Sequence, residues 1–188
     1  MENDFNLEKL KFPIGKFQKP DSIAENDLKI WIEVIQNFPI KIKKLTSTLS
    51  IEELNWVYRP NGWSIKQVVH HCADSHMNSF IRFKLALTED IPTIKPYEEA
   101  KWAELADGNS DNILPSIQII EGVHSRWVLL LKTFGKEELK KKFIHPANNK
   151  TSCLDEIIGL YAWHCNHHLA HIYQALVNKG QFKKNEKL

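Results

Sequence analysis

Four long stretches of this chain repeat apolar side chains every three or four residues, the spacing that gathers them on one face of an α-helix. We expect long helices over residues 22–49, 64–88, 113–134 and 152–179. Shorter helices are expected at residues 50–56, 97–105 and 136–143. We find no convincing strand and no internal repeat in the sequence. The pattern therefore predicts an all-α four-helix bundle with additional short helices.

Local signals mark where these helices begin and end. Residues 64–67 and 152–155 each have the form of a capping box, with a hydroxyl at the cap and an amide or carboxylate three residues later. Gly180 is expected to stop the last helix, and the tail at 179–188 is expected to fray. Pro39 lies inside the first helix and is expected to end, kink or restart it, because proline has no amide donor.

The composition fits one globular domain over residues 1–188, with 43% hydrophobic and 26% charged side chains. The formal net charge of +2 supplies no strong field for nucleic acid. No apolar run approaches the ~20 residues that span a bilayer, and the charged start does not resemble a secretory signal. Three cysteines are too sparse for a disulfide framework. We expect a soluble cytoplasmic protein with no nucleic-acid or membrane partner.

Histidines crowd the last expected helix, in the stretch YAWHCNHHLAHIYQ. His168 falls within the apolar stripe of that helix, and His164 and His171 lie at one edge of it. His167 lies further round, nearer solvent. Histidines four residues apart can hold one ion between them, so the pairs 164/168 and 167/171 both fit, and facing favours the first pair.

A second histidine group, in VVHHCADSH, lies on the expected helix at 64–88. His76 points into the apolar stripe, while His71 and His70 lie to either side of it. Periodicity does not choose between His71 and His76, and slightly favours His76. Three imidazoles from two helices would leave a fourth metal position open, whereas packed polar histidines are the alternative. Cys72 and Cys165 lie near the middle of their stripes, which favours buried thiols over ligands.

Several segments resemble the DinB-like superfamily, and within it the YfiT type of metal-dependent hydrolase. They are YRPNGWSIKQVVHHCADSHMNSFIRFKLAL and LYAWHCNHHLAHI, together with FPIGKF and IKPYEEAKWAEL. The resemblance covers nearly the whole chain. It implies a DinB four-helix bundle, one divalent metal per chain (zinc, or else nickel) and a homodimer.

The resemblance also implies which histidines hold the metal. By position they are His71, the second histidine of VVHHCADSH, and the H-x-x-x-H pair His164 and His168. Metal-bound imidazoles usually donate their other N–H to a supporting group. The candidates for such support, or for lining the pocket, are His76, His167, His171 and Asp74.

The resemblance and the histidines together suggest metal-assisted hydrolysis of a small-molecule substrate. This reaction would need a general base near the metal. The sequence offers Glu98, Glu99, Asp74 and His171 and does not choose among them, so the catalytic residue is left open.

Two other functions fit the same residues. One is S-transfer from a low-molecular-weight thiol such as bacillithiol, because a metal deprotonates a thiol that coordinates it. Its charged and apolar pocket walls would come from Arg59, Arg82 and Arg126, and from Trp56, Trp63, Trp102 and Trp163. The other is a non-catalytic bundle that binds a metal or ligand without turnover.

Overall fold

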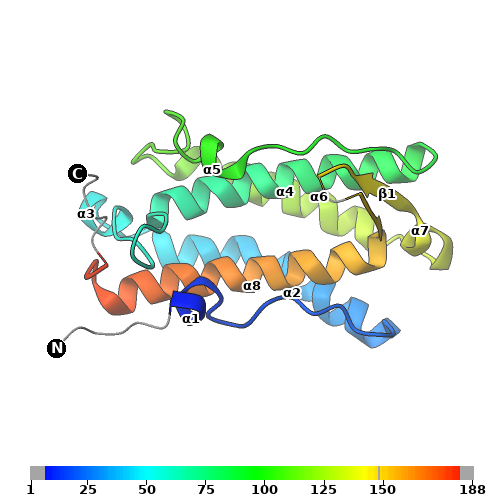
Figure 1. The fold of residues 1–188 in the computed structure, drawn as a ribbon, viewed down its shortest axis with the longest axis horizontal. Coiled ribbons are helices and arrows are strands. Elements are labelled where there is room, and N and C mark those ends of the chain that lie inside the picture. The colour runs from blue at the N-terminus through cyan, green and yellow to red at the C-terminus, as the bar shows by residue number, and fades with distance from the viewer. Residues whose placement is uncertain (1–6, 148, 183–188) are drawn as a thin grey trace.

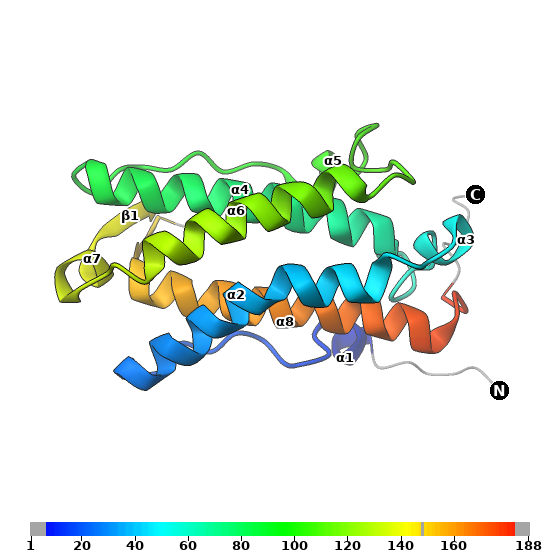
Figure 2. The same ribbon diagram turned by 180° about the vertical axis from the view of Figure 1, so that it is seen from behind.

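The computed structural model describes residues 7–147 and 149–182. Four long helices lie side by side along its length (Figure 1). They are α2 (Glu25–Thr46), α4 (Ile65–Thr88), α6 (Leu114–Leu131) and α8 (Leu154–Asn178). Helices α2 and α4 each pack against both α6 and α8, which closes the bundle; Figure 2 shows α2 and α6 from behind. The expected four-helix bundle is confirmed.

Four short helices join or precede the long ones. They are α1 (Leu7–Lys11), α3 (Ile51–Leu54), α5 (Glu99–Trp102) and α7 (Lys136–Lys140). The last three lie within the ranges where short helices were expected. Helix α1 was not expected, because five residues are too few for a periodic apolar face to show.

Ser64 begins α4 as the capping box predicted. The backbone N–H of Ser64 donates to Gln67 Oε1 at 3.1 Å, and the Gln67 N–H donates to Ser64 Oγ at 3.5 Å. The Gln67 amide also donates to the Ala103 oxygen at 2.9 Å. The connection after α5 is thereby tied to the start of the helix that carries His71.

Pro39 neither ends nor restarts α2, which runs through it. Because proline has no N–H, the carbonyl of Ile35, four residues earlier, has no donor within the helix. His124 of α6 lies in that place, with its Nδ1 2.6 Å from the Ile35 oxygen. A hydrogen bond between two helices therefore replaces the missing bond within one.

A hairpin replaces the loop and the capping box that were expected before the last helix. Strand β1 (Lys142–His145) pairs antiparallel with β2 (Lys150–Cys153). Ser152 lies in β2, and α8 begins at Leu154 with Cys153 at its cap. The expectation of no strand was wrong, because four-residue strands are too short for an alternating pattern to reveal them.

The segment between α1 and α2 runs along the outside of α8 (Figure 1). Trp163 Nε1 donates to the Gly15 oxygen at 3.1 Å, and Lys19 Nζ lies 3.1 Å from a carboxylate oxygen of Glu156. The ring of Phe12 stacks on His167, which is only 7% exposed. The expectation that His167 lies nearer solvent was wrong, since helical facing does not reveal a segment that covers the helix.

Helix α8 ends where Gly180 was expected to stop it. Lys179 and Gly180 both have positive φ, 48° and 69°. Phe182, in the expected tail, is buried at 3% exposure, and residues 183–188 of that tail lie outside the described residues.

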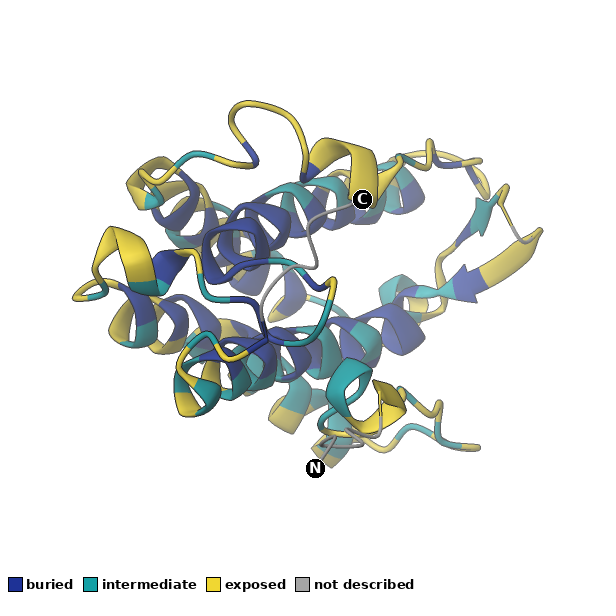
Figure 3. Ribbon diagram, turned by 60° about the vertical axis from the view of Figure 1, so that its left-hand side comes forward, coloured by how far each residue is buried: buried dark blue, intermediate teal, exposed yellow. Residues whose placement is uncertain are grey.

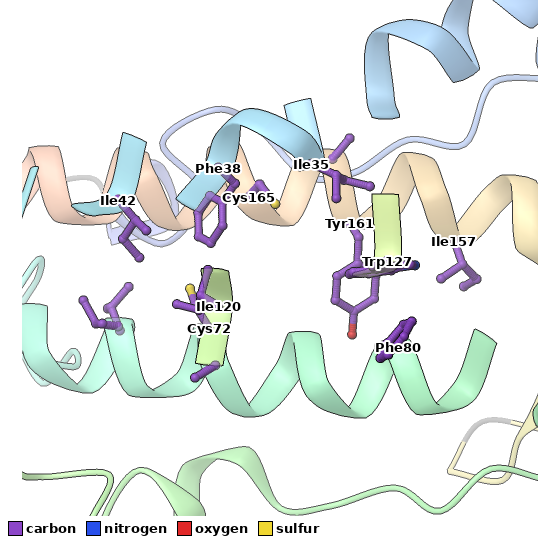
Figure 4. Packing of buried hydrophobic residues seen from close by; sticks show 14 of the residues in the cluster. Ile35, Phe38, Ile42, Cys72, Phe80, Ile120, Trp127, Ile157, Tyr161 and Cys165 are labelled. Carbon is purple, nitrogen blue, oxygen red and sulfur yellow. The ribbon is translucent and has the colours of Figure 1, made fainter. Parts of the chain in front are cut away.

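The core fills the space between the four long helices, with buried residues on their inward faces and exposed ones outside (Figure 3). Figure 4 shows Cys72 and Cys165 among these packed side chains, and both have 0% exposure. Burial raises the pKa of both thiols, which keeps them protonated.

Among the described residues, no helix combines the length and apolar character needed to cross a bilayer.

Candidate metal centre

Three histidines from two helices bring their Nε2 atoms together. Nε2 of His164 lies 3.4 Å from Nε2 of His71 and 3.2 Å from Nε2 of His168. Nitrogen ligands about 2.0–2.1 Å from a tetrahedral zinc ion would lie about 3.3 Å apart. The histidines that the resemblance implied are therefore close to the spacing of ligands around one ion.

The environment of these three rings favours the neutral form that binds metals. His71 and His168 are buried, and His164 is partly exposed. Burial lowers the pKa of His71 to about 4, and repulsion from His167 adds to the effect. Burial likewise lowers the pKa of His164 and of His168 well below the ordinary value. Neutral rings keep one lone pair each for a metal at neutral pH.

His76 contacts the far side of the His164 ring. Its Nε2 lies 3.0 Å from Nδ1 of His164, and its Nδ1 lies 2.7 Å from Nε2 of His124. Burial lowers the pKa of His124 to about 4, although its bond to the Ile35 carbonyl opposes the shift. The sequence reasoning missed His124, yet the signal was present, because this histidine shares the buried face of α6 with Ile120.

His171 contacts the far side of the His168 ring, as His76 does for His164. Nδ1 of His171 lies 3.4 Å from Nδ1 of His168, and Nε2 lies 3.1 Å from the Lys11 oxygen. The ring of His171 stacks on Tyr58 with centroids 3.8 Å apart. His167 instead stacks on Trp163, and its buried Nδ1 has no hydrogen-bond partner within the part of the chain that is described.

Two other candidates lie away from the three Nε2 atoms. His70 faces α6, where its Nδ1 lies 2.7 Å from Ser116 Oγ and its Nε2 lies 2.9 Å from the Ser110 oxygen. Burial raises the pKa of Asp74 to about 6, and repulsion from Asp107 adds to it. Asp74 does not line the cavity beside the histidines.

A cavity of about 310 Å³ opens beside His164. Its polar lining includes Arg82, Glu99, His145, Lys150, Glu156, Tyr161 and His164, and Lys150 pairs with Glu156 at 2.7 Å. Of the four base candidates only Glu99 lines it, and of the three arginines only Arg82 does. The expected tryptophans do not; apolar contact comes instead from Phe17 and Phe143.

His145 of the hairpin is a second residue that the sequence reasoning missed. Its buried Nδ1 has no partner among the described residues, and burial lowers the pKa of its ring. It escaped notice because its segment was expected to be a loop. A larger hollow of about 670 Å³, between α2, α6 and α7, contains no histidine, so size alone does not mark the site.

Three known proteins illustrate what this chain is similar to. The chain is 42% identical over 163 residues to the "Putative metal-dependent hydrolase YfiT" of Bacillus subtilis (strain 168), which covers 87% of the chain and 92% of the relative. A Halalkalibacterium halodurans relative, "Putative metal-dependent hydrolase BH0277", is 43% identical over 167 residues, 89% and 96% of the two chains. A "Putative metal-dependent hydrolase" of Bacillus cereus (strain 03BB102) is 49% identical over 166 residues, 87% and 93%.

A solved structure of one of these relatives shares the fold of this chain. The B. subtilis YfiT structure, described as "a probable metal-dependent hydrolase with an unusual four-helix bundle topology", superposes with a TM-score of 0.88 at 40% identity. The match covers 92% of this chain and 98% of that one. Residues 41–172 match the DinB_2 family, described as the DinB superfamily. The chain therefore belongs to the DinB superfamily, among the relatives of YfiT.

Proposed function

We propose that this chain is a metal-dependent hydrolase in which His71, His164 and His168 hold one divalent ion, zinc or else nickel. The observation that carries the proposal is the convergence of their Nε2 atoms, 3.2 and 3.4 Å apart, beside a charged cavity. A bound divalent ion lowers the pKa of water and polarises a carbonyl or phosphoryl oxygen. The names of the relatives support the same activity.

The cavity suggests how the protein's own side chains would serve hydrolysis. His164 is the least buried of the three histidines and forms part of the cavity wall. Glu99 lines the cavity and is exposed to solvent; removal of part of its hydration raises the pKa of its carboxyl, although nearby Arg82 opposes the shift. A carboxylate with a raised pKa is suited to accept a proton near neutral pH. Arg82 would bind an anionic part of a small substrate, because Lys150 is already paired with Glu156 of the same cavity at 2.7 Å.

Transfer of a low-molecular-weight thiol is the second candidate. The cavity combines cationic Arg82 with apolar Phe17 and Phe143, which suits an anionic thiol and an apolar electrophile. This reaction needs no base to activate water, so Glu99 would not be essential to it. Dependence of turnover on added thiol separates the two reactions.

The test begins with the metal content of untagged protein, measured by plasma mass spectrometry. Wild-type protein should carry one divalent ion per chain, and His71→Ala should lose it. His70→Ala is the matched control, since His70 is the neighbouring buried histidine and faces α6. Wild-type protein that stays empty after incubation with zinc and nickel would refute both enzymatic functions.

A substrate screen on the metal-loaded protein then tests the reaction. Small esters, amides and phosphoesters are supplied with and without thiols. Turnover that does not need thiol supports hydrolysis, whereas turnover that requires thiol supports transfer. Tight metal binding with no turnover of any substrate would support a non-catalytic binding bundle instead.

A further inference from the structure

The hydrogen bonds that reach His164 start at a defect in α2. In an unbroken helix the N–H of residue 39 would donate to the Ile35 oxygen, but Pro39 has no N–H. Ile35 is completely buried, and a buried carbonyl without a donor costs free energy. His124 supplies the donor, with Nδ1 2.6 Å from that oxygen.

The hydrogen bond between His124 and the Ile35 oxygen determines which nitrogen donates in each hydrogen bond from His124 to His164. A carbonyl oxygen only accepts, so the neutral ring of His124 carries its proton on Nδ1 and accepts at Nε2. Nδ1 of His76, 2.7 Å away, must then donate, which leaves Nε2 of His76 as an acceptor. Nδ1 of His164, 3.0 Å from it, must donate in turn. The lone pair of His164 is left on Nε2, which faces His71 and His168.

We propose that His124 and His76 are positioning residues that hold His164 in its Nδ1–H tautomer. Their orientation depends on the Ile35 carbonyl, which accepts from His124 because Pro39 has no N–H to donate to it. The Nδ1–H form is the minor tautomer of a neutral histidine side chain in water, so the protein must select it. The benefit to metal binding rests on the proposed function, but the tautomer itself is a property of the metal-free protein.

We call the series of hydrogen bonds from the Ile35 oxygen through His124 and His76 to His164 the relay. Each of its four residues comes from a different long helix. Ile35 lies on α2, His124 on α6, His76 on α4 and His164 on α8. The links therefore meet only when all four helices are packed. The tautomer of His164 is set by assembly of the bundle and not by its local sequence.

His168, the other candidate ligand on α8, also has a histidine hydrogen-bonded to its Nδ1. Nε2 of His171 donates to the Lys11 oxygen at 3.1 Å, so Nδ1 of His171 can accept from Nδ1 of His168 at 3.4 Å. His168 is then also left with a lone pair on Nε2. The Nε2 atoms of His164 and His168 lie 3.2 Å apart, each with a lone pair, an arrangement that a cation between them stabilises.

A second metal ion is the competing explanation for the buried histidines. His76, His124 and Cys165 offer ligand atoms within 4.8 Å of one another. The 2.7 Å between His76 Nδ1 and His124 Nε2 is a hydrogen-bond length, shorter than the about 3.3 Å between ligands of a tetrahedral zinc ion. Burial also raises the pKa of the Cys165 thiol and disfavours the thiolate that a metal requires. The geometry points to shared protons.

The experiment records long-range proton–nitrogen correlations of the histidine rings in ¹⁵N-labelled, metal-free wild-type protein. His164, His76 and His124 should each show a protonated Nδ1 and an unprotonated Nε2. Zinc affinity is then measured by chelator competition. His124→Phe should bind zinc about 10- to 100-fold more weakly and release His164 from a single tautomer. His124→Gln, whose Oε1 can accept from His76, should recover part of the loss.

His70→Phe is the matched control, because it removes a buried histidine that bridges α4 and α6 outside the relay. It should bind zinc as wild type does. Pro39→Ala restores a competing N–H for the Ile35 oxygen and should weaken zinc binding. Alanine favours the helix, so this variant serves if His124→Phe does not fold.

Three results would overturn the proposal. They are a protonated Nε2 on His164 in wild-type protein, zinc affinity unchanged in whichever of His124→Phe and Pro39→Ala folds, and two zinc ions bound per chain. A wild-type protein with the expected tautomers that binds no zinc would refute the metal site and leave the relay standing.

Discussion

His76 and His71 lie on opposite sides of the His164 ring: His76 Nε2 is 3.0 Å from its Nδ1, and His71 Nε2 is 3.4 Å from its Nε2. This relationship explains why periodicity could not separate the two α4 histidines. Both point into the bundle, and they differ only in which nitrogen of one ring they meet. Their roles are thus complementary, one beside the proposed ion and one behind it.

Glu99→Gln tests the proposed base. The change keeps the size of the side chain but removes the carboxylate, so hydrolysis should fall about 100-fold while the metal is retained. Initial rates and metal content measure the two effects. Glu98→Gln is the control, since Glu98 pairs with Lys101 and does not line the cavity. Equal losses in the two variants would exclude a specific role for Glu99.

Ser64→Ala should lower the free energy of unfolding by about 1 kcal/mol, because the N-cap of α4 loses its side-chain acceptor. Chemical denaturation followed by circular dichroism measures the loss. Ser125→Ala, at an exposed position within α6, should cost nothing comparable. If the two variants unfold at the same denaturant concentration, the cap contributes no stability.

Two glycine-to-alanine changes should shift stability in opposite directions. At Gly180, with φ of 69°, a Cβ would lie 2.4 Å from Trp56 Cδ1, so Gly180→Ala should destabilise the fold by roughly 1–2 kcal/mol. At Gly122, within α6, a Cβ would meet no atom within 4 Å, so Gly122→Ala should stabilise it by about 0.5–1 kcal/mol. Thermal unfolding measures both, and a shift of the same sign would contradict the prediction.

Acid should weaken the fold through Glu156. Burial by itself raises the pKa of this carboxyl, but hydrogen bonds from Lys150 and Lys19 outweigh it and leave the pKa lowered. A carboxyl with a lowered pKa stabilises the folded state above its ordinary pKa, and this contribution is lost as pH falls through the folded value. Unfolding free energies measured from pH 7 down to about 3 should therefore fall less steeply in Glu156→Gln than in wild type. Identical slopes would show that Glu156 does not contribute.

The sequence predicted the long helices because each repeats its apolar residues over many turns. It did not predict the hairpin or α1, since four or five residues carry too little periodicity. His71, His164 and His168 could be named only by adding a family resemblance to the facing of the helices. The place of His124 on the buried face of α6 could be predicted from helical spacing, but its role could not, because that role depends on the carbonyl of Ile35, which lies 89 residues away in the chain.

Two series of hydrogen-bonded histidines lead away from His164 and His168, and each ends at a main-chain oxygen. These oxygens belong to Ile35 and Lys11. A side-chain acceptor can be deleted by a single codon change, but every amino acid brings its own carbonyl. Positions 35 and 11 can therefore vary during evolution without removing the acceptor on which a histidine depends. Position 39 has no such freedom, because any residue other than proline adds an N–H that competes for the same oxygen. The constraint on the site thus falls on a proline that lies outside it.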